Sequence, residues 1–360
     1  MSTKGKERME ERSINVGLVG ITGYTGMELA RLLATHPRMR LTVACSRAEA
    51  GRRLGDFYPF LEKLPGADVV ISEFNARTAA QDCDVVFLAV PHGKAMEMAA
   101  DLLEAGTKVV DLSADFRLRD ADTYEAWYVP HTRKHLLHRA VYGLPELYAA
   151  EAARASLVAN PGCYPSASIL GLYPALKHGL IDTDGIVIDA KSGTTGAGRK
   201  AVVTSLYCEV NDTFRAYGLG KHRHTPEIEQ EVSLVAGRDV TVSFNPHLVP
   251  MNRGILATIY TRLLASDTTL DAVHEAYMET WGNSRWVRVL PKGKLPETRH
   301  VRGSMFCDIG LVVDPRTRRL IIVSAIDNLC RGASGQALAN ANLMCGLPVE
   351  TGLEGAPLMP

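Results

Sequence analysis

The sequence predicts an α/β protein with two domains: a doubly wound domain with a parallel sheet, then an α+β domain whose sheet is antiparallel or mixed. Three observations support this. The chain has 360 residues, enough for two domains. Over its first half, short apolar runs alternate with helical patterns. Over its second half, longer strand-like runs follow one another with few helices between them. We place the domain boundary near residue 160.

The first half carries the pattern of a parallel sheet. Short apolar runs that read as strands are followed by segments with helical spacing, and Leu29, Leu32 and Leu33 give one such segment its apolar face. Strands and helices that alternate at this spacing are typical of a parallel sheet with helices on both faces. The predicted strands are residues 14–19, 41–45, 84–90 and 108–112, and the predicted helices are residues 27–35 and 94–105.

The second half begins with a strand at residues 156–159, which leads into a turn that contains a cysteine. A helix then runs to about residue 178, and the last helical segment, residues 334–345, is placed to pack back on the first domain. Few helices interrupt the strands between these two segments, which favours an antiparallel or mixed sheet. The long predicted strands are residues 185–190, 240–245, 253–261, 306–313 and 319–326.

Residues 1–13 precede the first predicted strand. They are charged and have no apolar stretch, so we interpret them as a flexible tail and not as a secretory signal. We assign residues 14–160 and about 328–360 to the first domain and residues 161–327 to the second. The chain has no run of about 18 or more apolar residues, so no transmembrane helix is expected.

Composition narrows the class of protein. Lysine plus arginine and aspartate plus glutamate number 40 each, which argues against a partner that needs a basic face, such as nucleic acid or a membrane surface. The seven cysteines are odd in number and widely spaced, without a C-x-x-C pair, so they indicate neither a disulfide framework nor a zinc site. Free thiols favour a reducing compartment, and we expect a cytoplasmic protein with a small-molecule ligand.

A glycine-rich loop follows the first predicted strand and precedes a helix. Its spacing is G-x-x-G-x-x-G, in the sequence GITGYTG. Glycines let a backbone turn tightly and approach a pyrophosphate, and the helix that follows offers free N–H groups. A glycine triplet alone also fits an ordinary tight turn, but the strand and the helix around it favour a dinucleotide site. The predicted cofactor-binding residues are Gly20, Thr22, Gly23, Tyr24, Thr25 and Gly26.

The end of the second predicted strand bears on the choice of cofactor. NAD enzymes usually have an acidic residue there, which holds the ribose 2′-hydroxyl, whereas NADP enzymes supply a cation. Here the strand ends in Ser46 and Arg47, a hydroxyl and a guanidinium that suit a 2′-phosphate. The alternative is an ordinary surface Ser-Arg pair. The sequence therefore predicts NADP(H) over NAD(H).

One of the seven cysteines, Cys163, lies in a distinctive context. It stands in NPGCYP, between a predicted strand and a predicted helix, and Pro165 suits the first helical turn. The free amides and the dipole at a helix start lower a thiol pKa, and the same amides can hold an oxyanion. Other cysteines, such as Cys83 and Cys307, lie in or beside apolar runs and fit inert core positions. We therefore predict that Cys163 is a catalytic nucleophile.

A thiol nucleophile needs a proton acceptor, and KHRHTPE at residues 221–227 supplies two histidines. On an extended segment, His222 and His224 would point to one side and Arg223 to the other. One histidine would shuttle protons while the other contacts an anionic group of the substrate. No further ligands cluster nearby, so we do not expect a metal site. The remaining alternative is a pair of surface histidines.

A second glycine-rich loop, SGTTGAG at residues 192–198, follows another predicted strand and precedes the cations Arg199 and Lys200. Such a loop is suited to cradle a phosphate or a cofactor. We assign Ser192 and Gly193 to substrate binding. The alternative is a flexible surface loop.

Two further stretches are expected near the site. Residues 111–117 end a strand of the first domain, and in a doubly wound sheet that edge faces the ligand crevice. Arg117 is then a candidate phosphate clamp, with a structural ion pair to Asp115 as the alternative. Residues 328–335 open the last helix, and Asn328 is a candidate cofactor contact beside the nicotinamide. A simple helix cap would explain that stretch too.

Taken together, these motifs resemble the N-acetyl-gamma-glutamyl-phosphate reductases of arginine biosynthesis. The resemblance runs from about residue 14 to residue 348, and each glycine loop alone would be much less specific. Its landmarks are GITGYTG at 20–26, DLSADFRL at 111–118, NPGCYPSA at 160–167, KSGTTGAGR at 191–199, KHRHTPEIEQ at 221–230 and PHLVPMNRGIL at 246–256.

The resemblance implies a Rossmann domain that binds NADP(H), a catalytic and dimerisation α+β domain, and a homodimer or homotetramer. It implies that Cys163 is the nucleophile. The general acid/base histidine of the family lies in the H-R-H motif, and we carry that role to His224. His222 and Arg117 would then bind the phosphate or carboxylate of the substrate. The motif does not decide firmly between the two histidines.

The implied reaction is the NADPH-dependent reduction of N-acetyl-L-glutamyl 5-phosphate to the 5-semialdehyde and phosphate through a cysteine thioester. A related branch reduces aminoadipyl phosphate on a carrier protein in lysine biosynthesis, but the Cys-Tyr-Pro and Val-Pro-Met-Asn-Arg-Gly runs look more like the arginine branch. Aspartate-semialdehyde dehydrogenase would use the same chemistry on a shorter substrate. A non-catalytic NADPH-binding regulator is the alternative from another class.

Overall fold

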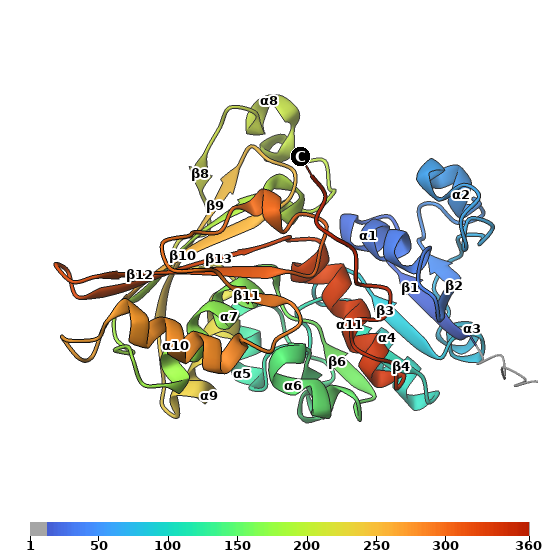
Figure 1. Ribbon diagram of the computed structural model, residues 1–360. Coiled ribbons are helices and arrows are strands. Elements are labelled where there is room, and N and C mark those ends of the chain that lie inside the picture. The colour runs from blue at the N-terminus through green and yellow to red at the C-terminus, as the bar shows by residue number, and fades with distance from the viewer. Residues whose placement is uncertain (1–12, 360) are drawn as a thin grey trace, which may run out of the picture.

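The computed structural model describes residues 13–359 and contains two sheets (Figure 1). The predicted tail, residues 1–13, lies outside the described residues apart from Ser13. One sheet is built from the first half of the chain, and the other from the second half. No helix in the described range is long and apolar enough to cross a membrane.

The first sheet has six strands, and every neighbouring pair is parallel. Its strands carry apolar side chains that are almost completely buried, as expected where helices cover both faces. The predicted parallel, doubly wound sheet is confirmed. In spatial order the strands are β2 (Met39–Cys45), β1 (Ile14–Val19), β3 (Val85–Leu88), β4 (Lys108–Asp111), β6 (Leu157–Ala159) and β5 (Ala140–Tyr142).

Helices cover this sheet on two sides, and each side has its own apolar core. The helix after the glycine loop and the last helix share one core, so residues from both ends of the chain pack together. The helices that share this core are α1 (Tyr24–Leu33), α6 (Pro145–Ala152) and α11 (Gly335–Met344). The helices on the opposite face are α3 (Ala76–Asp82), α4 (Ala95–Glu104) and α5 (Ala121–Trp127). The short helix α2 (Leu54–Phe57) lies near the rim of the sheet.

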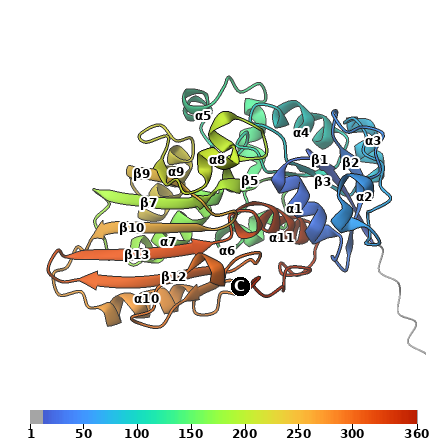
Figure 2. The same ribbon diagram turned by 90° about the horizontal axis from the view of Figure 1, so that it is seen from above.

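The second sheet has seven strands and is mixed (Figure 2). Two of its pairs, β7 with β9 and β11 with β12, are parallel, and the others are antiparallel. Of the two expected arrangements, the mixed one is therefore correct. In spatial order the strands are β11 (Val287–Val289), β12 (Cys307–Asp314), β13 (Arg319–Ile326), β10 (Ile255–Arg262), β7 (Ile186–Gly193), β9 (Val242–Val249) and β8 (Arg215–Ala216).

Helices cover one face of the mixed sheet. Buried residues alternate with partly exposed ones along β7 and β10, because successive side chains point to opposite faces. The covering helices are α7 (Cys163–Lys177), α9 (Thr225–Ala236) and α10 (Leu270–Trp281). Short 3-10 helices span Pro59–Leu61, Lys134–Arg139, Thr194–Ala197, Val203–Ser205 and Thr298–His300, and a π-turn spans Cys330–Ser334.

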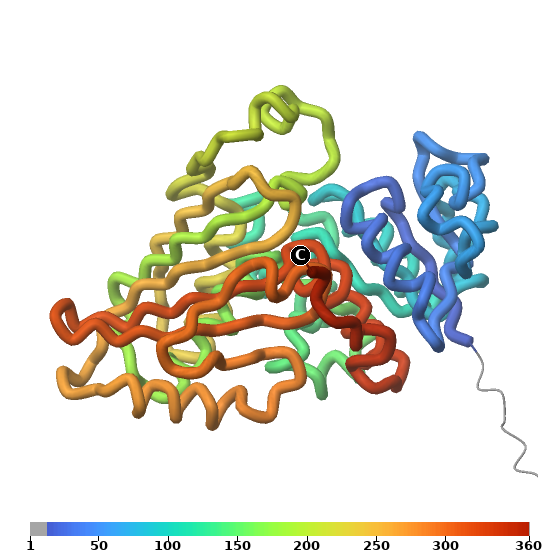
Figure 3. The backbone as a smooth tube through the Cα atoms, turned by 45° about the horizontal axis from the view of Figure 1, so that its top comes forward, coloured from blue at the N-terminus to red at the C-terminus, as the bar shows by residue number. Residues whose placement is uncertain are grey.

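Between β7 and α9 the chain forms a projection that we call the arm, residues 199–219. It contains the short helix α8 (Tyr207–Val210) and rises from the edge of the mixed sheet (Figures 1 and 3). Several large apolar side chains of the arm are exposed, including Val203 at 69% and Tyr207 at 75%. The arm is therefore a thin wall with little core of its own.

Candidate active site

Cys163 is the first residue of α7, as the sequence predicts. The chain leaves β6, passes Gly162 in an extended conformation, and then turns into the helix. No side chain caps this helix start, so its first backbone N–H groups are free for a ligand. All seven cysteines are free thiols, and Cys163 is mostly buried, with part of its surface still accessible.

Two clefts of about 610 Å³ each meet at Cys163. One, which we call the loop-side cleft, is bounded by the first glycine loop and the segment from Asn328 to Ala333. The other, the arm-side cleft, is bounded by the arm and by the turn that contains His222. The residues that line both clefts are His92, Cys163, Gly196, Ala197, Arg223 and His224.

The loop-side cleft has the form expected of a dinucleotide site. Gly20 has φ +92, and a Cβ there would lie 2.2 Å from the carbonyl oxygen of Ala89. A Cβ on Gly26 would lie 2.4 Å from the carbonyl oxygen of Gly20. Both positions therefore need glycine, and the backbone is free to approach a pyrophosphate at the uncapped start of α1. The other predicted loop residues, Thr22, Gly23, Tyr24 and Thr25, line this cleft directly.

A smaller cleft of about 410 Å³ lies at the end of β2 and extends from the glycine loop. The predicted residues Ser46 and Arg47 both line it, and Lys94 adds a second cation. Glu73 lies at the same cleft. Because Arg47 is exposed, its guanidinium has room to turn toward a 2′-phosphate.

The histidine pair is close together, but the reason differs from the expectation. Residues 222–224 form a turn and not an extended segment, and His224 is the residue that precedes helix α9. Pro226 in the first turn of that helix explains why the chain bends there. The backbone N–H of His224 donates to Nδ1 of His222 over 3.1 Å, and the two rings lie 4.9 Å apart in a T-shaped contact.

His224 lies nearer to the cysteine turn than His222 does. A Cβ on Gly162 would be only 2.6 Å from Nε2 of His224, so this nitrogen faces the backbone next to Cys163. Nδ1 of His224 is buried without a hydrogen-bond partner among the described residues. Burial, and then the neighbouring His222 and Arg117, hold the pKa of His224 well below its usual value. Burial likewise lowers the pKa of His222, to about 4.

The cysteine itself departs from expectation. Burial raises the pKa of the Cys163 thiol to about 11, although Arg117 and the backbone N–H of Tyr164 act in the opposite direction. The predicted lowering by the helix start is therefore too weak to prevail, because removing a thiolate from water costs more than two nearby amides return. With both histidine pKa values lowered and the thiol pKa raised, the resting site holds a neutral thiol and neutral imidazoles.

Glu227, which the sequence reading did not single out, joins the two catalytic segments. Its Oε1 accepts the backbone N–H of Gly162 over 2.7 Å and the Tyr142 hydroxyl over 2.8 Å. It lies on the first turn of α9, three residues after His224. A single buried carboxylate therefore ties the cysteine turn to the histidine helix. The glutamate stands in the same motif as the histidines, and its spacing from them was the available signal.

Arg117 is buried directly behind this turn and lines the loop-side cleft. Its Nε donates to the carbonyl oxygen of Asn160 over 2.8 Å, and its Nη1 lies 3.3 Å from Glu227. Asp115, the alternative partner, instead accepts the backbone N–H groups of Gly93 and Ala95 at the start of α4. The structure thus shows a structural ion pair for Arg117, but with Glu227. Its role as a phosphate clamp stays a prediction.

The second glycine-rich loop contributes to the site through its later residues. Ser192 and Gly193 end β7 and line neither of the two main clefts, so their role in substrate binding stays a prediction. The stretch from Thr195 to Arg199 lines the loop-side cleft instead. Arg199 also reaches across and donates to the carbonyl oxygen of Thr22 over 2.8 Å.

Three more residues complete the walls around Cys163: Asn328, Gly332 and His92. Asn328 lines the loop-side cleft, as predicted for a cofactor contact. Gly332, in the π-turn, packs so closely that a Cβ there would lie 2.8 Å from Cβ of Cys163. His92 was not predicted, although it follows β3 at the edge that faces the crevice. Its Nδ1 accepts the Ala114 N–H, and burial lowers its pKa to about 3.

Comparison with known proteins agrees with this arrangement. Residues 15–155 match the family model described as semialdehyde dehydrogenase, NAD binding domain, and residues 163–328 match semialdehyde dehydrogenase, dimerisation domain. Among solved structures, aspartate semialdehyde dehydrogenase II from Vibrio cholerae, complexed with ASA, covers 93% of this chain and 99% of its own, with a TM-score of 0.70 at 15% identity. The Candida albicans enzyme with NADP covers 92% and 98%, with a TM-score of 0.70 at 18% identity.

The curated relatives are much closer in sequence. N-acetyl-gamma-glutamyl-phosphate reductase of Geobacter sulfurreducens is 54% identical over 348 residues, which are 96% of this chain and 100% of the relative. The Pelotomaculum thermopropionicum protein of the same name is 49% identical over 349 residues, 97% of this chain and 100% of its own. With identity at this level over nearly the whole chain, the protein belongs to the N-acetyl-gamma-glutamyl-phosphate reductase family.

Proposed function

We propose that the protein reduces N-acetyl-L-glutamyl 5-phosphate to N-acetyl-L-glutamate 5-semialdehyde and phosphate, with NADPH as reductant, in arginine biosynthesis. One observation carries this proposal: a thiol at an uncapped helix start, with a buried histidine beside it, stands where two clefts meet. One cleft fits a dinucleotide, and the other leaves room for an acyl phosphate. The name of the full-length relatives supplies the substrate.

NADP(H) is the proposed cofactor. Gly20, Gly23 and Gly26 would let its pyrophosphate approach the start of α1, with Thr22, Tyr24 and Thr25 beside it. Ser46 and Arg47 would hold the 2′-phosphate, and Asn328 would line the nicotinamide end. When bound, the cofactor supplies the hydride that converts a thioester carbonyl to the aldehyde level.

The residues of the chain perform the remaining steps. As the Cys163 sulfur attacks the acyl carbon, its proton passes to Nε2 of neutral His224. The bond between the acyl carbon and the phosphate oxygen breaks, phosphate leaves, and a thioester forms on Cys163. After reduction, the carbon–sulfur bond of the hemithioacetal breaks, the aldehyde is released, and His224 returns the proton to the sulfur. The free N–H groups at the start of α7 would stabilise the oxyanion.

His224 is proposed as the acid/base and His222 as a substrate contact. His224 lines both clefts and faces Gly162, whereas His222 lines only the arm-side cleft and its Nδ1 is occupied by the N–H of His224. We keep Arg117, Ser192 and Gly193 as proposed substrate residues. The cations that line the arm-side cleft and suit an anionic substrate are Arg215, Lys221 and Arg223.

The assembly and the division into domains are also proposed. We infer a homodimer or homotetramer, supported by the match of residues 163–328 to a dimerisation domain. We infer that residues 14–160 with about 328–360 form the NADP-binding Rossmann domain and that residues 161–327 form the catalytic and dimerisation domain. The packing of α11 with α1 supports the return of the chain to the first domain. A cytoplasmic location is proposed from the free cysteines.

The reverse reaction tests the function. Purified protein is incubated with N-acetylglutamate semialdehyde, phosphate and NADP, and NADPH formation is followed by its absorbance. We expect phosphate-dependent NADPH formation, with kcat/KM lower for aspartate semialdehyde and for the aminoadipate semialdehyde of the lysine branch. Higher kcat/KM for either of these would overturn the substrate assignment. Equal kcat/KM with NAD and NADP would overturn the cofactor assignment.

A further inference from the structure

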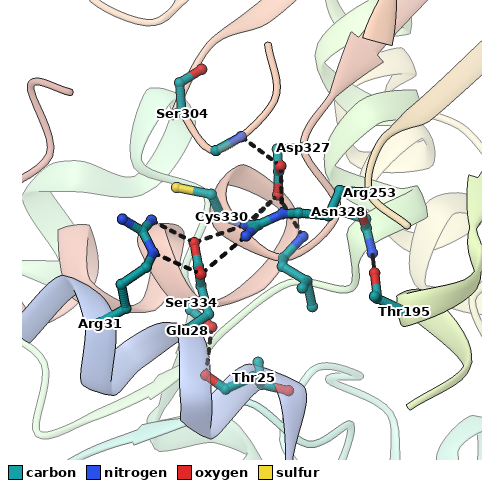
Figure 4. Close-up of polar contacts among 12 residues, drawn as sticks. Thr25, Glu28, Arg31, Thr195, Arg253, Ser304, Asp327, Asn328, Cys330 and Ser334 are labelled. Carbon is teal, nitrogen blue, oxygen red and sulfur yellow. Dashed lines mark hydrogen bonds and ion pairs between the residues drawn. The ribbon is translucent and has the colours of Figure 1, made fainter. Parts of the chain in front are cut away.

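A buried ionic network connects helix α1, which packs on the parallel sheet, with the ends of β10 and β13 in the mixed sheet (Figure 4). Its centre is Arg253, on the loop before β10. The Arg253 guanidinium donates to both oxygens of Asp327, at 2.9 and 3.0 Å, and to both oxygens of Glu28, at 3.1 and 2.8 Å. Glu28 lies on α1, two residues after Gly26 of the glycine loop, and Asp327 follows β13. We call Glu28, Arg31, Arg253 and Asp327 the Arg253 network.

The network is balanced in charge and well satisfied. Glu28 also accepts two hydrogen bonds from Arg31. Burial alone would raise the pKa of this carboxyl, but the hydrogen bonds and charges of Arg31 and Arg253 together outweigh it and lower the pKa to about 2. Asp327 is fully buried and accepts the backbone N–H groups of Gly303, Leu329 and Cys330 in addition to Arg253. Two carboxylates thus face two guanidinium groups, and no charge in the cluster lacks a partner.

The network is continuous with the wall of the loop-side cleft. Asn328 is the next residue after Asp327, and its Oδ1 accepts the N–H of Gly254, the residue after Arg253. Its Nδ2 donates to Oγ1 of Thr195, which lines the cleft. Further along, Ser334 donates to the carbonyl oxygen of Thr25 in the glycine loop. The same segment carries Gly332, which packs on Cys163.

We propose that Arg253 is a positioning residue for the reaction. By holding α1 against the end of β13, it fixes the spacing between the glycine loop, which would hold the pyrophosphate, and the wall of Asn328 and Gly332, which would flank the nicotinamide and Cys163. Arg253 does not line the loop-side cleft itself, so it would act only through these neighbours. This inference rests on the proposed function, since it presumes that a dinucleotide spans the cleft.

The choice of arginine follows from its geometry. Its planar fork offers five N–H donors, so one side chain can grip two carboxylates at once. A lysine has the same charge but a single ammonium, which cannot form two bidentate pairs. A lysine at position 253 would therefore keep the charge balance of the network but would not fix the distance between α1 and the end of β13.

The test uses Arg253→Lys, Arg253→Met and Glu28→Gln in the full-length protein. Arg288→Met is the matched control, because Arg288 forms a comparable bidentate pair with buried Asp308 at 2.6 and 2.9 Å, between β11 and β12. Two properties are measured without turnover: the NADPH dissociation constant from nucleotide fluorescence, and the rate at which iodoacetamide alkylates Cys163 in the absence of nucleotide. Thermal midpoints are recorded for all four variants.

We expect Arg253→Lys and Glu28→Gln each to weaken NADPH binding roughly tenfold, while Cys163 alkylation stays within about twofold of the wild-type rate. The double variant Arg253→Lys/Glu28→Gln should bind NADPH no more weakly than the weaker-binding single variant, because both substitutions break the same contact between Glu28 and Arg253. Arg288→Met should lower the thermal midpoint without changing the dissociation constant. If Arg253→Met does not fold, the other two variants still decide the question.

Three outcomes distinguish the possible failures. If the wild-type protein binds NADPH and catalyses phosphate-dependent NADP reduction, but Arg253→Lys and Glu28→Gln bind NADPH as tightly as wild type, the positioning role is overturned and the proposed function stands. If the wild-type protein shows no such reduction with any of the three semialdehydes, the proposed function fails. A loss of NADPH affinity in Arg288→Met equal to that in Arg253→Lys would reduce the effect to general destabilisation and would also overturn the inference.

Discussion

The two walls around Cys163 differ in how they are held. The loop-side wall is fixed by buried polar contacts between distant segments, with Asp327 and Asn328 bonded to three other stretches of chain. The arm-side wall is different: within the described chain, the hydrogen bonds of residues 200–214 all have partners inside residues 200–215. The loop-side wall, which we propose holds the cofactor, is therefore preformed. The arm-side wall, which we propose holds the substrate, includes a segment with few hydrogen bonds to the rest of the chain.

The loop-side wall and the arm also differ in how deeply their side chains are buried. The loop-side segment around Arg331 is almost completely buried, whereas Val203 and Tyr207 of the arm are mostly exposed. Side chains locked by packing hold a site more precisely than side chains on a projecting loop. The difference suggests that cofactor affinity responds to small changes in packing, while the arm tolerates substitution. Cys163 lies where the two walls meet, so substitutions there should have the largest effects.

Substituting Cys163 with serine should have the largest effect. A hydroxyl is a far weaker nucleophile than a thiolate, so we expect kcat of the phosphate-dependent reaction to fall roughly 10⁴-fold or more. The NADPH dissociation constant should remain within about twofold, because the loop-side wall is intact. Retention of a substantial part of the wild-type activity would remove Cys163 from its catalytic role.

Substitutions of the two histidines should have the next largest effects, and these effects should differ from each other. His224→Asn should lower kcat by roughly 10²–10⁴-fold, the usual effect of removing a general acid/base. His222→Asn should act chiefly on the KM for the semialdehyde, by roughly tenfold, because His222 lines only the arm-side cleft. Steady-state kinetics of the reverse reaction give both values. The reverse result, a kcat loss confined to His222→Asn, would exchange the two assignments.

The pH dependence of Cys163 alkylation reports the pKa of the thiol without the need for turnover. With a thiol pKa of about 11, only about one molecule in 10³ carries the thiolate at pH 8, and alkylation should still be accelerating above pH 9. The unfolded thiol loses its proton near pH 9, so the folded state binds the extra proton between pH 9 and 11, and this group loses its contribution to stability as pH rises through that window. Peptide mapping by mass spectrometry can use exposed Cys208 as an internal reference. A plateau below pH 8 would restore the lowered pKa that the helix start suggests.

A methyl group added to the loop-side wall should lower both the free energy of unfolding and kcat. In Gly332→Ala the new Cβ would lie 2.8 Å from Cβ of Cys163, closer than real contacts allow. Overpacking of this kind costs about 1–3 kcal/mol of folding free energy, and it should displace the sulfur and lower kcat by roughly tenfold. Urea unfolding and kinetics measure the two effects. Gly220→Ala provides a control for stability, since no atom lies within 4 Å of a methyl group added there, although its φ of +68 carries its own strain.

The smallest effect is expected on the arm. Tyr207→Ser and Val203→Ser remove exposed apolar surface, so each should change the free energy of unfolding by no more than about 0.5 kcal/mol. The NADPH dissociation constant should not change, because neither residue lines the loop-side cleft. A loss of NADPH affinity in either variant would contradict the contrast between the two walls.

The sequence was a good guide wherever the pattern is local. Continuous apolar runs located five of the six strands of the parallel sheet, and the three glycines located the loop before α1. Helix α10 went unnoticed, although Val273, Tyr277 and Trp281 give it a helical stripe and Thr269 caps it. The short strands β5, β8 and β11 were missed, because two or three residues carry little pattern of their own.

The parts of the site that sequence reasoning missed depend on tertiary contacts. The helix start at Cys163 is visible in the sequence, but the burial that raises its pKa is not. Glu227 and Gly332 act because the fold brings them to Gly162 and Cys163 from 65 and 169 residues away along the chain. Ser192 and Gly193 were chosen as the start of a loop, and the structure places the later residues of that loop at the cleft. The H-x-H pair was read as extended because the helix start at Pro226 was not used as evidence.

The return of α11 to the first sheet has a consequence for biosynthesis of the chain. Leu338 and Met344 share a core with Val16 and Leu29, so the N-terminal sheet lacks part of its apolar cover until helix α11 has left the ribosome. The second sheet must therefore emerge before the first can be completed. The two halves of the molecule should unfold as one cooperative unit, and a nascent chain should stay exposed to chaperones and proteases until α11 has emerged.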